Sequence, residues 1–585
     1  MPSTQRIMKT WILGLLALVS ASTWATSSPA SSGGSSAVWG YHPPAEPADF
    51  CSLDSPYEEM PFTAPADPSV CPPPPESCTG AACSASEACM GPRARYESQI
   101  VCAGIAGCCL AGSVAPDGVV NVLPYLGRTV SADPAVDGTH VDDSPGIAHA
   151  IKCAMLQPTT RHTVAFPAGR YVLRSPLRPE HNDLTLEGPE LSPDAAPGDP
   201  GTATLVALPC NPEQLPGAIQ VNKVALNSSG KWVSENVSEV WIRNFQIELT
   251  EGPRETANSG IRMNNCSSCV VENIIMRYAP NPPQPPKCKP SNLDGITFSL
   301  GSGGVIRNVI VDGVPKGGIY LSSVTNYHAT PPILVENCEV KNINGPVGAG
   351  GIKIITANVT VRNCEVHHNW VSSGAPSGGY GLWLAAQIPG VENPSPYPSN
   401  VVVQDSYFHH NSNSGVTMAS PVENYRAENI TLDRVKFAYN GGYGVHIQAG
   451  TGVQLLDVWS WGNGSYGMYL TSKSGLAASA LRVGTVYMEN PIVFDNGLTA
   501  SQNLPGILLQ ASNITIDGGD FARCEVPPEE EEEELRGKQT GSIQQKCWQS
   551  GPTGGQVLFH PTNNVISGVD THGTNALPEV LACNL

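Results

Sequence analysis

The chain has 585 residues and a formal net charge of −19, and only 14% of its residues are charged. Charged residues that favour helices are scarce, and the chain has 59 glycines and 53 prolines. This composition argues against a helical bundle and favours short strands joined by turns. The negative charge disfavours nucleic acid as a partner, because phosphate binding needs a basic face. It does not exclude an acidic glycan, which responds to local rather than total potential.

The N-terminus predicts export. Arg6 and Lys9 precede an apolar run from Trp11 to Val19, which is shorter than the roughly 20 residues that a membrane span needs. We therefore assign residues 1–25 to a signal peptide and expect a secreted, extracellular protein with no membrane span. All 18 cysteines follow this segment, which fits an oxidising compartment. Seven Asn-x-Ser/Thr sequons indicate a glycoprotein if the host is eukaryotic.

Two segments precede the main domain. Residues 26–50 are rich in Ser, Gly, Ala and Pro and predict a disordered linker. Residues 51–112 hold eight cysteines between Cys51 and Cys109, with too few apolar residues for a core of their own. We expect these cysteines to pair among themselves. A disulfide-stapled spacer is favoured over a small carbohydrate-binding module, because no aromatic platform is visible.

A helix and several strands open the next domain. Residues 144–156 predict a helix with Asp143 or Ser144 as N-cap and Pro145 in the first turn. Strands are expected at Thr163–Leu173 and Leu184–Gly188. The motifs that carry a family resemblance are Asp137-Gly138, Asp142-Asp143, Phe166-Pro167-Ala168-Gly169 with Tyr171, and Leu184–Gly188.

In these motifs the chain resembles the pectate-lyase-like superfamily, which includes polysaccharide lyases, polygalacturonases and epimerases. The resemblance implies an all-β fold, a single-stranded right-handed parallel β-helix whose N-terminal end is capped by the helix. We assign residues 113–523 to this solenoid and residues 524–585 to an acidic loop, including Glu529–Glu534, and a C-terminal cap.

A short phrase recurs along the solenoid: a glycine, then an apolar, a variable and an apolar residue. Recurrence at intervals of roughly 20–50 residues indicates a repeat architecture, and alternation with period two indicates strands. With the glycine as position zero, positions one and three point into the core and position two points outward. The residues at position two, which we call the outer stripe, are Arg262, Thr297, Tyr320, Lys353, Trp383, Thr417, His446, Tyr469 and Leu508.

The composition of the outer stripe suits an acidic polysaccharide. Aromatic faces stack on sugar rings, and Lys and Arg pair with uronate carboxylates. The alternative is that the aromatic side chains pack under neighbouring loops. We favour a groove whose substrate-binding residues are Arg262, Trp383, Tyr469 and Asn292.

A lyase acting on pectin or alginate is the favoured activity. It requires a base for the proton beside the uronate carboxylate, and Lys353 or His446 are the candidates, with Tyr320 as proton donor and Arg262 as carboxylate neutraliser. Strand spacing places Lys353 and His446 roughly 14 Å apart, too far for one shared step.

Two other classes remain open. Asn292 and Asp294 resemble the Asn-x-Asp-Gly motif of polygalacturonases, which would make Asp294 a catalytic acid of a glycoside hydrolase. A hydrolase needs a second carboxylate nearby, and the family's other motifs are absent. The third class is a non-catalytic glycan-binding or adhesion β-helix.

Other columns of aligned residues are more often structural in a solenoid. We expect an asparagine ladder (Asn369, Asn411, Asn440, Asn463), a charge column (Asp405, Arg434, Asp457) and inward-facing Cys338 and Cys364. A second candidate column, for a metal or a general base, consists of His367, His368, His409 and His410.

We expect no metal and no cofactor, since the calcium-assisted reaction needs several acidic ligands on one face and none is seen. We expect the protein to be a monomer.

Overall fold

The protein is described here in a computed structural model. The described residues are 109–110, 112–131, 141–207, 217–226, 232–249, 258–278, 293–299, 301–322, 332–345, 350–371, 378–385, 397–419, 427–471, 483–494, 496–498, 504–519, 543–545, 548–550, 557–559, 564–567 and 579–580. They belong to one compact unit, Pro43–Leu585. The signal peptide, the linker, nearly all of the Cys-rich segment, Asn292 and the Glu529–Glu534 run lie outside them.

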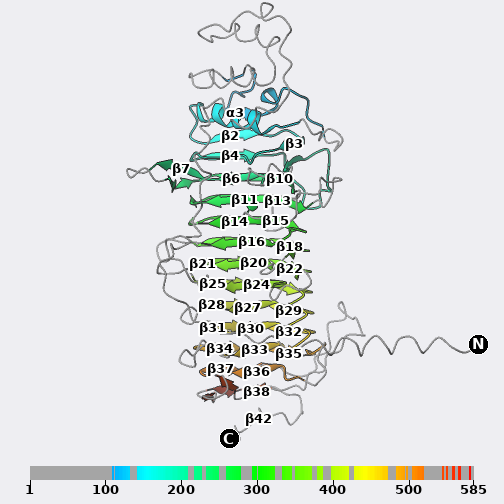
Figure 1. Cartoon of the computed structure of the whole chain (residues 1–585), viewed down its shortest axis with the longest axis vertical. Helices are drawn as coiled ribbons and strands as arrows, with labels where there is room; N and C mark the ends of the chain where they lie inside the picture. The colour runs from blue at the N-terminus through cyan, green and yellow to red at the C-terminus, as the bar shows by residue number, and fades with distance from the viewer. Residues whose placement is uncertain are drawn as a thin grey trace, which may run out of the picture. The chain divides into compact units, whose positions relative to one another are not determined.

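The predicted helix is α3 (Ser144–Met155), and it lies beside β1 (Val120–Asn121) and β2 (His162–Ala165) at the N-terminal end of the coils (Figure 1). Its buried face includes Ile147, Ala150 and Ile151, as its apolar periodicity predicted. The N-cap is Asp143, but its carboxylate makes no capping bond. That carboxylate instead pairs with Arg128 at 2.5 Å and accepts a bond from the amide of Val172 at 2.7 Å.

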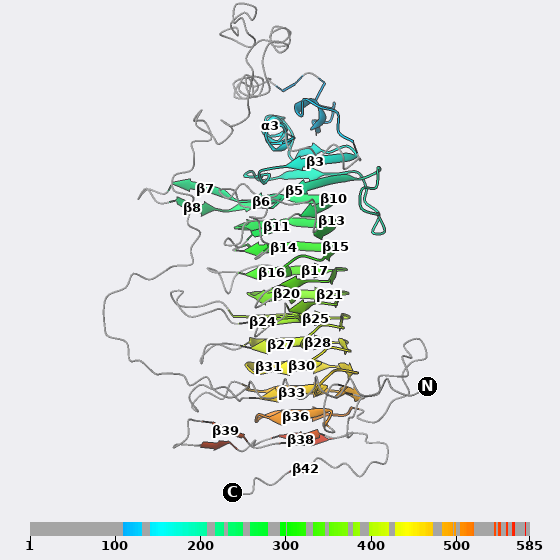
Figure 2. The same ribbon diagram turned by 45° about the vertical axis from the view of Figure 1, so that its right-hand side comes forward.

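One face of the solenoid is a sheet with one strand from each coil, all paired in parallel (Figure 2). Its strands, in order, are β6 (Ile219–Val221), β11 (Asn258–Asn264), β14 (Leu293–Ser299), β16 (Gly317–Ser322), β20 (Gly350–Ile355), β24 (Tyr380–Ala385), β27 (Val416–Ala419), β30 (Val445–Ile447), β33 (Met468–Thr471), β36 (Ile507–Gln510), β38 (Ile543–Gln545) and β42 (Glu579–Val580). We call it the twelve-stranded sheet.

The remaining walls form a sheet of 22 strands, to which many coils contribute two strands. They are β1, β2, β3 (Gly169–Leu173), β4 (Leu184–Glu187), β5 (Ala203–Ala207), β10 (Trp241–Leu249), β13 (Val270–Tyr278), β15 (Val305–Asp312), β17 (Ile333–Glu336), β18 (Glu339–Lys341), β21 (Ala357–Arg362), β22 (Glu365–His367), β25 (Ser399–Gln404), β26 (Tyr407–His409), β28 (Ala427–Asp433), β29 (Lys436–Ala438), β31 (Gly450–Leu456), β32 (Trp459–Trp461), β34 (Val486–Glu489), β35 (Ile492–Phe494), β37 (Ile514–Asp517) and β41 (Val565–Ser567).

A short 3-10 helix, η4 (Leu123–Tyr125), precedes α3, and four short pairs complete the described strands. They are β7 (Lys223–Leu226) with β8 (Trp232–Glu235), β9 (Val237–Ser238) with β12 (Cys266–Ser267), β19 (Asn344–Gly345) with β23 (Trp370–Val371), and β39 (Trp548–Ser550) with β40 (Val557–Phe559).

Asparagine ladders join the coils at their corners. The predicted ladder exists and continues to Asn496: each buried amide donates to the next residue's oxygen at 2.8–2.9 Å. A second ladder, which the sequence pattern did not predict, runs along Asn244, Asn273, Asn308 and Asn337. Its members have φ between 52° and 64°, a left-handed conformation that asparagine tolerates because its side chain hydrogen-bonds locally.

Alternating charges form a further column on the 22-stranded sheet. Successive coils place Glu187, Arg243, Glu272, Arg307, Glu336 and Arg362 in register. Neighbours pair, as in Arg243–Glu187 at 2.9 Å and Arg362–Glu336 at 2.8 Å. The charge column predicted from the sequence is confirmed in part: Arg434 pairs with Asp405 at 2.7 Å, whereas Asp457 accepts a bond from Asn490.

The cysteines confirm one prediction and correct another. Cys338 and Cys364 are buried in adjacent coils, which confirms the expected inward orientation, and both are free thiols. Cys109 does not pair within the Cys-rich segment, because it forms a disulfide with Cys153 of α3. The chain just before the first coil passes beside the capping helix, a proximity that sequence separation does not reveal. A second disulfide, Cys266–Cys269, closes a short turn.

Among the described residues, no helix combines the length and apolar character that crossing a bilayer requires.

Candidate active site on the twelve-stranded sheet

The outer stripe exists as one continuous column. Register pairs join Arg262 to Thr297, Tyr320, Lys353 and Trp383 on successive strands β11 to β24. The column continues through Thr417, His446, Tyr469 and Leu508 on β27 to β36. Positions one and three of each phrase are buried, as expected. At position two the expectation of exposed side chains is wrong for Thr297, Thr417 and Leu508, which are buried, and the other six side chains are half-buried.

The repeated glycine at position zero has a packing reason. A Cβ at Gly318 would lie 2.1 Å from Cγ1 of Val340, and one at Gly351 would lie 2.2 Å from Cγ1 of Val366. Position zero therefore faces the core, at the point where the chain leaves the turn and enters the strand. The residue at position one is also buried in the core. Only glycine leaves room for the valine on the opposite wall.

Lys353 lies at the centre of the stripe between two aromatic rings. Its Nζ is 4.4 Å from the ring centre of Trp383 and 5.0 Å from that of Tyr320, within the range of cation–π contacts. Burial lowers the pKa of Lys353 from 10.5 to about 8, and the nearby Asp294 partly offsets this effect. An amine with such a pKa is partly neutral near physiological pH and is able to accept a proton.

Asp294 on β14 is the acidic member of this cluster. It is 5% exposed, and Nζ of Lys316 lies 3.5 Å from its Oδ2. Burial raises the pKa of Asp294, while Lys316, Lys353 and Arg262 oppose the rise. Lys316 was missed from the sequence because it stands in a turn, two residues before the phrase "GIYL", and not at position two.

Tyr320 on β16 completes the cluster. Burial and the neighbouring Asp294 raise the pKa of its phenol, so the hydroxyl keeps its proton at neutral pH. The cluster thus combines a proton acceptor, a proton donor, and cations that suit a substrate carboxylate. We call Asp294, Lys316, Tyr320, Lys353 and Trp383 the lysine cluster.

His446 and Tyr469 do not join the lysine cluster. Their rings stack on each other at 5.2 Å, beside Tyr443. Burial lowers the pKa of His446 to about 4, and its Nε2 has no hydrogen-bond partner among the residues described here. Three strand steps, roughly 14 Å, separate His446 from Lys353. The two base candidates therefore do not form one site.

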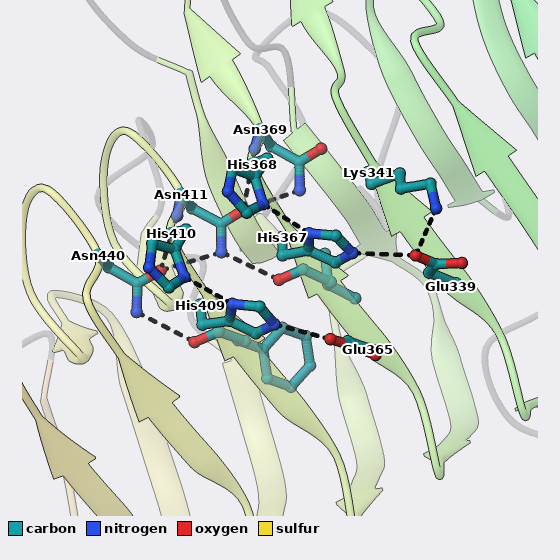
Figure 3. Close-up of polar contacts among 12 residues, drawn as sticks. Glu339, Lys341, Glu365, His367, His368, Asn369, His409, His410, Asn411 and Asn440 are labelled. Carbon is teal, nitrogen blue, oxygen red and sulfur yellow. Dashed lines mark hydrogen bonds and ion pairs between the residues drawn. The ribbon is translucent and has the colours of Figure 1, made fainter. Parts of the chain in front are cut away.

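The second candidate column lies on β22, β26 and the turns that follow, in the 22-stranded sheet. Figure 3 shows the two histidine pairs one above the other, with His367 stacked on His409 at 4.9 Å and His368 on His410 at 5.0 Å. Each pair is joined through Nδ1 atoms, at 2.6 Å and 2.7 Å.

In each pair, the first histidine also contacts a glutamate carboxylate. Nε2 of His367 contacts Glu339 at 3.1 Å, and Nε2 of His409 contacts Glu365 at 2.9 Å (Figure 3). Burial is the main cause that lowers the pKa of His409, to about 4, and that of His368. The repetition of the same contacts on consecutive coils indicates a structural ladder, and the lysine cluster is the stronger candidate site.

No three His, Cys, Asp or Glu side chains within the described ranges are arranged to hold a metal ion.

Two protein-family models match the chain. The rhamnogalacturonase A/epimerase, pectate lyase-like family matches residues 130–375, and the right handed beta helix region matches residues 294–483. No curated protein matches the chain in sequence.

Solved structures with a similar course of the chain have low identity. The surface adhesin PfbA of Streptococcus pneumoniae is 13% identical, with 77% of this chain and 90% of that chain covered and a TM-score of 0.43. The A-module of the mannuronan C-5 epimerase AlgE4 of Azotobacter vinelandii is 13% identical, with 78% and 99% covered and a TM-score of 0.37.

The tailspike protein of E. coli bacteriophage HK620, solved in complex with a pentasaccharide, is 13% identical, with 77% and 79% covered and a TM-score of 0.40. These likenesses assign no function to the chain. The stacked coils and the match to the right handed beta helix region confirm that the chain is a right-handed parallel β-helix, and over residues 130–375 it is similar to the rhamnogalacturonase A/epimerase, pectate lyase-like family.

Proposed function

We propose that the protein is a lyase-type enzyme acting on an acidic, uronic-acid-containing polysaccharide such as pectin or alginate. The observation that carries this proposal is the amine of Lys353, whose pKa is lowered to about 8 between two aromatic rings of the outer stripe. A surface lysine that served only to pair with an acidic chain would gain nothing from desolvation, because burial disfavours the charged form.

The reaction uses three groups of the lysine cluster. The neutral amine of Lys353 removes the proton from the ring carbon beside the uronate carboxylate. The electron pair forms a ring double bond, and the glycosidic C–O bond at the next carbon breaks. The phenol of Tyr320, on the adjacent strand, gives its proton to the leaving oxygen.

Cations stabilise the charge that develops on the substrate carboxylate. Lys316 lies in the cluster and is the nearest cation. Arg262, three strand steps from Lys353, acts on the cluster only through its charge, which opposes the rise in the pKa of Asp294. Asp294 raises the pKa of Lys353 and so partly offsets the lowering by burial and by Lys316. The amine therefore stays basic enough to accept a proton. Trp383 supplies a face for the sugar ring.

The alternatives have less support. A glycoside hydrolase needs two carboxylates about 5–9.5 Å apart, and Asp294 is the one carboxylate in the described part of the lysine cluster. A non-catalytic glycan-binding or adhesion protein needs the aromatic and cationic side chains but not a lysine of lowered pKa. The match of the rhamnogalacturonase A/epimerase, pectate lyase-like family spans Asp294, Tyr320 and Lys353 and supports activity on a polysaccharide, without favouring one of these reactions.

Secretion remains a prediction from the N-terminal sequence. It is supported by the disulfides Cys109–Cys153 and Cys266–Cys269, since such bonds persist in oxidising compartments. Glycosylation and the monomeric state also remain predictions.

The test is to incubate the purified protein with pectin, polygalacturonate and alginate across pH 6–10. Unsaturated ends, seen by ultraviolet absorbance, would establish a lyase. Reducing ends without unsaturation would establish a hydrolase, and retention on the polysaccharide without cleavage would establish a binder. Inverted sugar configuration with an uncut chain would indicate an epimerase, which shares the proton-abstraction step.

Variants then assign the roles. Lys353→Met and Tyr320→Phe are expected to lower kcat by at least about 100-fold, the scale of positioned acid–base groups. The matched control is Lys436→Met, at an exposed lysine of β29 on the other sheet, which is expected to leave kcat unchanged. A wild-type rate that does not rise as pH increases toward about 8 would contradict Lys353 as the base.

A further inference from the structure

Two free thiols stack on consecutive coils inside the solenoid. Cys338 follows β17 and Cys364 follows β21, and the two residues occupy corresponding positions. The register establishes this correspondence, because Glu339 pairs with Glu365 directly after the two cysteines. The amide of Glu365 donates to the carbonyl of Cys338 at 2.9 Å, so the two backbones are direct neighbours.

The fold does not require cysteine at these two positions. The same inward column contains a buried residue on each neighbouring coil: Ile274, Val309, Ser406, Val435 and Val458. Valine therefore fills this place on three of the coils that the structure describes, and serine fills it on one. Packing alone does not explain why two consecutive coils carry a thiol.

The two sulfur atoms are close enough to influence each other. The sulfur of Cys364 reaches the coil of Cys338, because it lies 3.8 Å from the carbonyl oxygen of Val335 on β17. Both cysteines are 2% exposed. Burial raises the pKa of the Cys338 thiol, whereas a hydrogen bond with Cys338 lowers the pKa of Cys364. Cys364 is therefore the member of the pair that ionises more readily and is the better nucleophile.

The spacing of the coils fits a disulfide. Neighbouring strands lie roughly 4.8 Å apart, and disulfides join residues whose Cα atoms are about 4.4–6.8 Å apart. Both side chains enter the core from the same wall, so rotation of the side chains, without a new course of the backbone, brings the sulfur atoms together. The other cysteines in the described ranges already form the disulfides Cys109–Cys153 and Cys266–Cys269.

We propose that Cys338 and Cys364 are a redox-sensitive crosslink: oxidation joins them in a disulfide between two consecutive coils, and reduction releases it. The crosslink connects the coil that contains β20, with Lys353, to the coil that contains β24, with Trp383. The inference does not depend on the proposed lyase activity, because it concerns how firmly the coils are held together.

The oxidant is a small disulfide such as oxidised glutathione. The thiolate of Cys364 attacks one of its sulfur atoms, which forms a mixed disulfide and releases one glutathione thiolate. The thiol of Cys338 then loses its proton and attacks the sulfur of Cys364, and the second glutathione leaves as a thiolate. The two cysteine protons pass to the two released thiolates, so one disulfide is consumed and one is made. Because both cysteines are buried, the exchange occurs when the coils stack during folding or open locally.

Differential alkylation measures the state of the pair. Full-length protein is equilibrated in oxidising or reducing glutathione buffer, with urea just below the unfolding midpoint so that the coils open transiently. Free thiols are then blocked with N-ethylmaleimide in denaturant, and tryptic peptides are analysed by mass spectrometry. We expect linked peptides containing Cys338 and Cys364 in the oxidised sample and blocked thiols at both positions in the reduced sample. Blocked thiols in both samples, or a link from either residue to another cysteine, would overturn the proposal.

Urea unfolding tests the consequence for stability. The double variant Cys338→Val/Cys364→Val retains every other cysteine and introduces the side chain that Val309 and Val435 already place in this column. The urea midpoint of the wild type relative to this variant should be about 1 M higher in oxidising than in reducing buffer. An equal difference in both buffers would show that the pair does not hold the coils together and would refute the proposal. If the valine variant does not fold, the double serine variant replaces it, since Ser406 occupies the same column.

Discussion

Replacing Lys353 with methionine should stabilise the protein while it abolishes turnover. The folded state lowers the pKa of Lys353 from 10.5 to about 8, so the charged amine costs about 3 kcal/mol at neutral pH, at 1.36 kcal/mol per pH unit. Methionine avoids this cost but loses the cation–π contacts with Trp383 and Tyr320, together worth about 1–2 kcal/mol. The expected net gain is about 1–2 kcal/mol at pH 7.

The pH dependence has a definite sign. Because the pKa of Lys353 is depressed in the folded state, the wild type loses stability as pH falls from about 10.5 to about 8 and is unaffected below that range. The advantage of Lys353→Met should therefore be full at pH 7 and smaller by more than about 2 kcal/mol at pH 10.

Urea unfolding followed by circular dichroism at both pH values measures this difference. Lys436→Met, at an exposed lysine, serves as the control and should show no change between pH 7 and pH 10. A Lys353→Met protein that is less stable at pH 7, or a difference that is the same at both pH values, would show that the amine is solvated and the reasoning wrong.

Three further predictions concern the stripe and the ladders. Trp383→Ala should weaken polysaccharide binding about tenfold by removing a stacking face, with the circular dichroism spectrum unchanged; affinity electrophoresis measures this, and unchanged mobility would mean that the tryptophan only packs. Asn440→Ala should lower the free energy of unfolding by about 2–4 kcal/mol, because the buried amide bonds to both neighbouring coils. Asn429→Ala should cost less than about 1 kcal/mol, because Asn429 is exposed and its amide donates to Asn400 at the surface. His409→Gln should leave turnover intact, since it lies on the 22-stranded sheet; a loss of turnover with normal stability would return the site to the histidine column.

Much of the fold follows from residues alone. The spacing of the glycine phrases predicted every register pair from Arg262 to Leu508, because a strand alternates its side chains and a solenoid stacks equivalent positions. The helix Ser144–Met155 was predicted within one residue at its end. Within the site, Lys353, Tyr320 and Trp383 were predicted to be neighbours for the same reason.

Other parts of the site are not encoded in a local pattern. Lys316, in a turn, pairs with Asp294 on the adjacent coil, and whether a turn residue points at a strand depends on how the backbone bends at the corner. The neighbouring glycines illustrate the same point: a Cβ at Gly317 would meet the carboxylate of Asp294, whereas a Cβ at Gly318 would meet the core side chain of Val340.

The sequence by itself thus determined the register of the coils, since period-two strands and one obligatory glycine per coil permit only one alignment of the phrases. Only the tertiary structure decided how deeply each outward side chain is buried and what charges surround it. Burial lowers the pKa of Lys353 to about 8 and that of His446 to about 4, although both occupy position two of the same phrase. Desolvation and Coulomb interactions depend on atoms from several coils at once, and no single phrase contains them.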